Sequence, residues 1–97
     1  MTTYIHLASF TGQGVQNIAD SPNRLDDAKE LATSLNGEFK AFFLTMGQYD
    51  IVAITEFPDD ETAAQFALGV AREGAVTTET LKAFPEEEYR DVITGMS

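Results

Sequence analysis

At the middle of the chain stands Thr45-Met46-Gly47-Gln48-Tyr49-Asp50, a turn-forming stretch between two apolar runs. The runs cover residues 38–46 and 49–57 and are typical of strands. A two-residue connection with glycine first favours a type II′ hairpin turn, which pairs Met46 with Tyr49. That pairing fixes the register of the two strands and so decides which side chains share a face of the sheet.

Outward from this hairpin, strand and helix patterns alternate along the chain. Residues 4–10 and 75–84 are typical of strands, and apolar residues at helical spacing predict helices over residues 21–36 and 58–74. We expect a loop over residues 12–20, which is long for a strand-to-helix connection. The order predicts an α+β fold of the ferredoxin-like βαββαβ type, with an antiparallel four-stranded sheet and two helices on one face.

The ends of both helices carry their own signals. Ser21 suits the N-cap of the first helix, and Pro22 suits its first helical position. Gly37 suits the left-handed conformation that follows a last helical turn. Asp59 and Asp60 place negative charge at the start of the second helix, where the helix dipole favours it.

The strands present two different sets of side chains. An aliphatic set is expected to face the helices; it comprises Ile5, Leu7, Ala41, Phe43, Val52, Ile54 and Leu81. The other set is expected on the open face; it comprises Tyr4, His6, Phe10, Phe42, Leu44, Met46, Tyr49 and Ile51. An apolar patch of this size usually marks an interface. The pattern therefore predicts a homodimer with its two sheets packed face to face, and a higher oligomer if further edges pair.

Composition limits the classes of function. The chain has 97 residues, no cysteine and a net charge of −10. We expect one domain over residues 1–84, followed by an acidic C-terminal helix or tail over residues 85–97, with Tyr89, Val92 and Ile93 as anchors. The negative charge argues against nucleic acid or membrane partners. The lack of cysteines, of a long apolar span and of a signal-peptide pattern predicts a cytoplasmic protein.

His6 and Tyr49 are the first candidates for a ligand site. His6 is the only histidine, and on an inner face it can act as a general base or bind a ligand. A structural role within an apolar strand is the alternative. The Tyr49 hydroxyl can orient a substrate, or the ring can pack across from Met46 and anchor the turn.

Two lysines and two threonines fall in phases that can line the same inner surface: Lys40, Lys82, Thr78 and Thr80. In an acidic protein, lysines there favour an anionic or carbonyl-bearing ligand. The alternative is that both lysines lie at the sheet rim and extend into water. Asp50 is expected to accept hydrogen bonds from nearby backbone N–H groups or from Thr45.

No pattern predicts a cofactor or a metal. Gly12-Gln13-Gly14 lacks the third glycine of a dinucleotide fingerprint, because Asn17 stands at that position. Asp59-Asp60-Glu61 lacks the spacing of a calcium loop. A single histidine without cysteines argues against a zinc or iron site.

Gly47-Gln48-Tyr49-Asp50 resembles the Gly-x-Tyr-Asp signature of the GYD domain family. Other similar pieces are Thr11-Gly12-Gln13-Gly14, Ser21-Pro22-Asn23-Arg24, Pro58-Asp59-Asp60 and Thr78-Glu79-Thr80-Leu81-Lys82-Ala83-Phe84. The resemblance covers nearly the whole chain to Phe84, with Lys82 where arginine is common. It implies a dimeric α/β-barrel fold and no particular activity, since the wider fold group includes cofactor-free monooxygenases, isomerases, haem enzymes and small-molecule sensors.

Three functions remain open at this point. The first is a small-molecule-binding dimeric barrel without catalysis. The second is a cofactor-free oxygenase or isomerase that acts on a small hydrophobic or aromatic substrate, with His6 as the base. The third is a structural oligomerisation module. A cavity lined by His6 and Tyr49 would favour the first two over the third.

Overall fold

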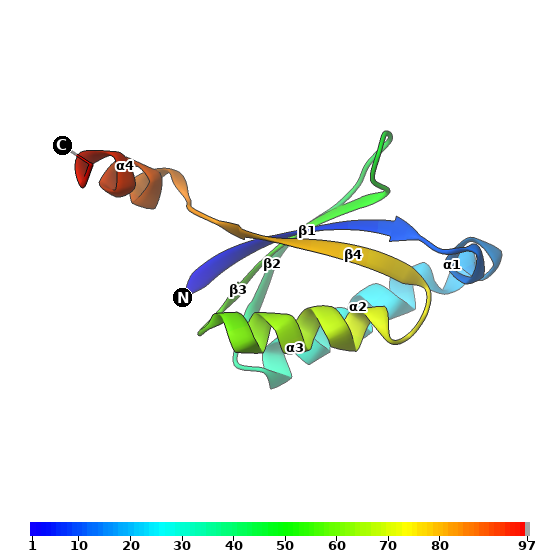
Figure 1. The fold of residues 1–97 in the computed structure, drawn as a ribbon. Helices are drawn as coiled ribbons and strands as arrows, with labels where there is room; N and C mark the ends of the chain where they lie inside the picture. Colours follow the sequence, from blue (N-terminus) through cyan, green and yellow to red (C-terminus); the bar gives the residue numbers. More distant parts are fainter. Residues whose placement is uncertain (97) are drawn as a thin grey trace.

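The computed structural model describes residues 1–96 and has a sheet layer and a helix layer (Figure 1). The sheet consists of β1 (Thr2–Phe10), β2 (Glu38–Leu44), β3 (Ile51–Phe57) and β4 (Val76–Ala83). Helices α2 (Ser21–Ser34) and α3 (Asp60–Ala71) lie side by side on one face of it. The predicted α+β, ferredoxin-like arrangement is confirmed.

The sheet is antiparallel throughout, with strand order β2-β3-β1-β4. β1 lies inside the sheet, where Ile5 pairs with Ile54 of β3 on one side and with Leu81 of β4 on the other. β1 is therefore hydrogen-bonded along both of its edges, to β3 on one side and to β4 on the other.

The face that the helices cover is the opposite of the expected one. Tyr4, His6 and Ala8 of β1 are buried, and the His6 ring lies 5.2 Å from the ring of Phe66 on α3. The aliphatic set lies on the uncovered face instead, by alternation along the paired strands; it comprises Ile5, Leu7, Ala41, Phe43, Val52, Ile54 and Leu81.

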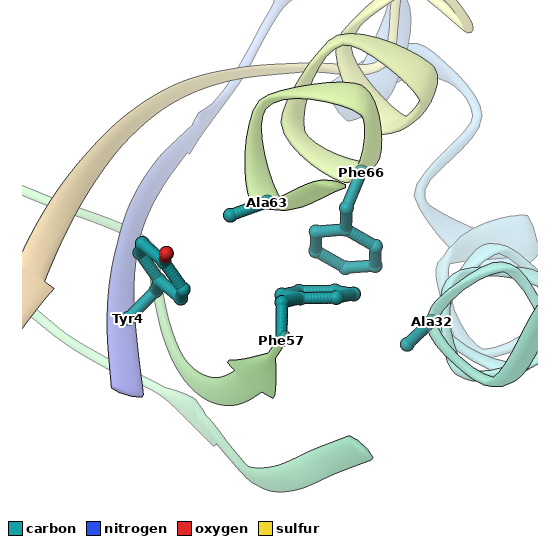
Figure 2. Packing of buried hydrophobic residues seen from close by; sticks show 5 residues of the cluster. All are labelled: Tyr4, Ala32, Phe57, Ala63 and Phe66. Carbon is teal, nitrogen blue, oxygen red and sulfur yellow. The ribbon is translucent and has the colours of Figure 1, made fainter. Parts of the chain in front are cut away.

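Packing explains this reversal. Both faces of the sheet are apolar, so alternation offers no polar side to mark the solvent. The aromatic side is covered because its rings pack beneath part of the helix layer (Figure 2): Phe57 of β3 and Phe66 of α3 face each other with centroids 5.1 Å apart. Tyr4 and Ala63 complete the cluster on one side and Ala32 on the other.

The hairpin keeps the predicted register, but its turn is wider. The ladder ends at the pair Leu44–Ile51, so that Met46 and Tyr49 lie in the connecting loop and not in the strands. Thr45 closes the loop, because its N–H donates to the Asp50 carbonyl (2.8 Å) and its hydroxyl donates to the Tyr49 carbonyl (2.6 Å).

A β-bulge at Lys40 alters the faces of β2. Phe39 pairs with Thr55, whereas the next paired residue, Ala41, is opposite Ile54. The extra residue turns Phe39 toward the helices, where its ring lies 6.4 Å from that of Phe66. Without the bulge, regular alternation would put Phe39 on the same face as Ala41 and Phe43.

The segment expected as a loop contains α1 (Gly12–Gln16) and the 3-10 helix η1 (Ile18–Asp20). Thr11 caps α1 by accepting a hydrogen bond from the Gly14 N–H (3.1 Å). It also fastens α1 to the start of β4, because its hydroxyl donates to the Gly74 carbonyl (2.6 Å) and its N–H donates to Ala75 (3.0 Å).

Two of the expected helix ends differ in detail. Ser21 is the first residue of α2 and not its cap, because η1 leads directly into the helix. At the other end Asn36, not Gly37, takes the left-handed conformation (φ 61°). Gly37 is required for another reason: a Cβ there would overlap the ring of Phe57.

The last helix, α4 (Glu86–Thr94), projects away from the rest of the molecule beyond β4 (Figure 1). The expected anchors Tyr89, Val92 and Ile93 are 56%, 49% and 51% exposed, so they do not fasten α4 to its own sheet or helices. No helix within residues 1–96 is long and apolar enough to cross a membrane.

Candidate functional site

His6 lies in the middle of β1, on the helix-covered face. Its Nε2 is 2.7 Å from the hydroxyl of Thr55 on β3, and its Nδ1 is 3.0 Å from the hydroxyl of Thr80 on β4. The ring thus links the strands on either side of β1. Thr80 was expected near a ligand, whereas the role of Thr55 escaped sequence reasoning because it depends on the cross-strand register.

Burial lowers the pKa of His6 to about 4, so the ring is neutral at pH 7. In a neutral imidazole one nitrogen donates and the other accepts, and each of the two threonine hydroxyls can take either role. A base with this pKa takes up protons weakly near neutral pH, and both nitrogens already have partners. The arrangement therefore fits a fixed wall residue better than a proton acceptor.

A cavity of about 290 Å³ lies between the sheet and the two helices, with His6 in its wall. Its lining is mostly apolar, and the aromatic members are Phe10, Phe39, Phe42 and Phe66. Cavities that bind small molecules measure about 300–1,000 Å³, so this one suits a small ligand. Phe10, Phe42 and Ile51 line this cavity, although they were expected on the open face.

Arg24, on the first turns of α2, also lines the cavity. Its Nη1 donates to the Asn17 carbonyl (3.1 Å), which holds the guanidinium at the η1–α2 junction. Its Nη2 is buried without a hydrogen-bond partner. Sequence reasoning noted Arg24 only within a family motif, because nothing local indicates that α2 aims this side chain at a cavity.

Lys82 lies on the helix-covered face but pairs with a carboxylate at the start of α3. Its Nζ donates to Asp60 Oδ2 (3.3 Å), while the Tyr4 hydroxyl donates to Asp60 Oδ1 (2.5 Å). Burial and the bond to Asp60 raise the pKa of Tyr4 to about 12, and the bonds from Tyr4 and Lys82 lower the pKa of Asp60. This cluster borders a shallow groove between α3 and β4, outside the cavity.

Lys40 and Tyr49 do not reach the cavity either. Lys40 is exposed on the bulge of β2 and pairs with Glu38 (3.2 Å). The Tyr49 hydroxyl donates to Glu79 (3.3 Å), a residue of β4 on the uncovered face. The structure therefore brings together His6, Thr80 and Thr78 of the predicted residues, with Thr78 in the cavity wall.

Asp50 has the structural role that its position predicts. Its Oδ2 accepts a hydrogen bond from the Phe10 N–H (2.9 Å), and its own N–H donates to the Ala8 carbonyl (2.9 Å). The side chain thus continues the β1–β3 pairing beyond the last ladder pair. Within residues 1–96, no three histidine, aspartate or glutamate side chains are grouped so that they could hold a metal ion.

Comparison with known proteins places these features in a family. The model of the GYD domain matches residues 4–93, which extends into α4. A relative from Thermus thermophilus, named glutamine synthetase and cystathionine beta-lyase binding protein, is 33% identical over 86 residues, covering 88% of this chain and 90% of the relative.

Two solved structures have a similar fold. TTHA0845, also from Thermus thermophilus, has a TM-score of 0.57 at 26% identity, over 88% of this chain and 95% of that one. The leucine response regulatory protein LrpA of Mycobacterium tuberculosis has a TM-score of 0.65 at 11% identity, over 87% of this chain. The chain spans 51% of LrpA, and this likeness concerns the fold alone.

Proposed function

The chain belongs to the GYD domain family, and we propose that it is a cytoplasmic small-molecule-binding protein that acts as a homodimer. The observation that carries the proposal is the apolar cavity of about 290 Å³ between sheet and helices. A core formed only for stability fills such a space with side chains, since protein interiors are close-packed. An unfilled space lined by aromatic rings and a few polar groups has the usual character of a ligand site.

Binding accounts for the site better than catalysis does. An oxygenase or isomerase that used His6 as its base would need a pKa near the working pH. Burial instead holds the pKa of His6 at about 4, and Thr55 and Thr80 occupy both nitrogens. In the proposed binding protein, His6 and Thr78 shape the cavity wall, Thr80 holds the His6 ring in place, and no cofactor takes part.

Filling the cavity tests this function. Ala28 lies on α2 in the cavity wall, and Ala28→Phe adds a ring directed at that space. Ala64→Phe makes the same change on α3, outside the cavity. A ligand at about 100 times its Kd adds about 2.7 kcal/mol to the free energy of unfolding. For a chain of this size, that raises the Tm by on the order of 10 °C.

We expect small aromatic and aliphatic compounds to raise the Tm of the natural protein and of Ala64→Phe, but not of Ala28→Phe. Differential scanning fluorimetry, followed by calorimetric titration of the hits, gives the measurement. Equal shifts in both variants would place the ligands elsewhere on the molecule and contradict the proposal.

The homodimer is proposed through the uncovered sheet face. Phe43 and Leu81 there are 55% and 41% exposed, and the central strands add Ile5, Val52 and Ile54. In the dimer, these side chains would be buried against the same side chains of the second copy, because a two-fold interface uses the same patch on both subunits. Association is expected although the two faces are reversed, because the aliphatic set is also an apolar surface.

A second candidate function is binding to other enzymes. It is favoured by the name of the Thermus relative, a binding protein for glutamine synthetase and cystathionine beta-lyase. Biolayer interferometry with immobilised chain and purified glutamine synthetase tests it directly. Saturable binding would support this function, whereas no response at micromolar enzyme would argue against it.

A further inference from the structure

Arg24 carries a buried guanidinium nitrogen that lacks a partner. Nη2 is shielded from solvent without a hydrogen bond, while Nη1 is held by the Asn17 carbonyl at 3.1 Å. Buried polar groups in native proteins are nearly always bonded, because an unbonded charged donor is costly to desolvate. A missing acceptor at this position is therefore a feature of the site that needs an explanation.

The protein does not supply that acceptor from its own acids. It has sixteen acidic residues against six basic ones. The ion pairs found within residues 1–96 join Lys40 to Glu38, Lys82 to Asp60 and Arg90 to Glu86. Asp27 and Glu73 also border the cavity, but neither has an oxygen within pairing distance of Arg24. In so acidic a chain, an arginine left without an acid beside a cavity points to a ligand acid.

The rest of the cavity sets the character of the ligand. His6 is neutral and uses both ring nitrogens within the protein. Most of the remaining wall is apolar, with Ala8, Ala53 and Phe66 near the histidine. A guanidinium presents its donors as a planar fork that matches the two oxygens of a carboxylate.

We propose that the cavity takes a small apolar molecule with a single carboxylate, and that the Arg24 guanidinium binds this carboxylate while the apolar part lies against Phe66 and the sheet. The proposal rests on the small-molecule function proposed above. Arg72 also lines the cavity, but the wall contains the acids Asp27 and Glu73 as well. A phosphate ester fits less well than a carboxylate, because its second negative charge would lie in a mostly apolar wall beside these two acids.

Matched acids and amides test the proposal. Phenylacetate and octanoate are titrated against phenylacetamide and octanamide by calorimetry at pH 7. The protein is the full chain with its natural sequence, or with Arg24→Gln, Arg24→Lys or Arg90→Gln. Arg90→Gln removes the same charge on α4, far from the cavity. Circular dichroism confirms that each variant is folded.

We expect at least one acid to bind the natural protein and Arg90→Gln about tenfold or more tightly than its amide, the scale of one charge-assisted hydrogen bond. Arg24→Gln should reduce the affinity for the acid to that for the amide. Arg24→Lys should fall between the two, because it keeps the charge without the fork. If Arg24→Gln does not fold, the test is whether the ratio of acid affinity to amide affinity is smaller in Arg24→Lys than in the natural protein.

Other outcomes separate this proposal from the one on which it rests. If acids and amides bind equally and Ala28→Phe weakens both, the cavity binds ligands but the carboxylate assignment is wrong. The assignment is also wrong if the preference for acids persists in Arg24→Gln. If a phosphate monoester such as phenyl phosphate binds more tightly than every acid, the ligand class is wrong. If no probe binds below about 1 mM, both proposals fail.

Discussion

His6 makes the free energy of unfolding depend on pH. The pKa of this imidazole is about 4 in the folded protein and 6.5 as its ordinary value, because burial disfavours the charged ring. Between these values the unfolded chain binds more protons than the folded one, so acid favours unfolding. Stability from this group is complete above pH 6.5 and is lost as the pH falls toward 4. We expect a loss of about 2–3 kcal/mol between pH 7 and pH 4.5.

Urea denaturation at the two pH values measures that loss, with His6→Gln as the control. Carboxylates titrate in both proteins, so the difference between them isolates the imidazole. The loss should be smaller in His6→Gln by about the amount given above. The NMR signal of the ring gives a second readout, and a titration midpoint near 6.5 would show that the buried environment does not act on His6.

Asp50 and Arg24 show which residue roles can be predicted from the sequence and which cannot. Asp50 was expected to accept a backbone hydrogen bond, and it accepts one from Phe10. The expectation succeeded because it needs only a short polar side chain beside a strand end. Arg24 matters because helices and strands that are distant in sequence enclose a space beside it. No local pattern carries that information.

At the scale of elements, the lack of a side chain at Gly14 lets α1 pack closely against Ala75, just before β4. A Cβ at Gly14 would overlap the Ala75 carbonyl oxygen, which accepts the hydrogen bond from Thr11. Gly12 lies two residues earlier in the same helix with open space around it. Gly14→Ala must therefore push α1 away from β4, while Gly12→Ala meets nothing.

We expect Gly14→Ala to lower the free energy of unfolding by about 1–3 kcal/mol, the usual cost of forcing extra atoms into a packed contact. Gly12→Ala should leave it unchanged or raise it slightly, because alanine favours helix more than glycine does. Chemical denaturation followed by circular dichroism compares the two. Equal effects would mean that glycine flexibility, and not the close contact, explains Gly14.

The identity of the elements was readable from the sequence, but their orientation was not. Alternation and helix spacing predicted four strands and two helices in the right order. The choice between the two faces of the sheet failed because Ile5 and Tyr4 belong to equally apolar sets. The bulge at Lys40 added a local error, because one extra residue in a strand leaves no mark in its composition. Which of the two sets faces the helices depends on how aromatic rings such as Phe66 pack against the sheet.

At the scale of the whole molecule, the sheet has one covered face and one bare face (Figure 1). The bare face holds apolar side chains at its centre, where Ile5 pairs with Ile54 and Leu7 pairs with Val52. Stable interfaces bury about 800 Å² on each partner. The proposed dimer uses this face, because its aliphatic side chains could pack against the same side chains of a second copy.

Ile54→Lys tests this dimer at the centre of the face. An isoleucine that is buried on association contributes about 1.5–3 kcal/mol, and a lysine in its place must leave its ammonium unsolvated between two apolar sheets. We expect the dimer Kd to rise by at least about 100-fold, measured by sedimentation equilibrium. Leu68→Lys is the control, because Leu68 is 70% exposed on α3, away from this face. It should sediment like the natural protein, and a natural protein that is monomeric at micromolar concentration would refute the proposed assembly.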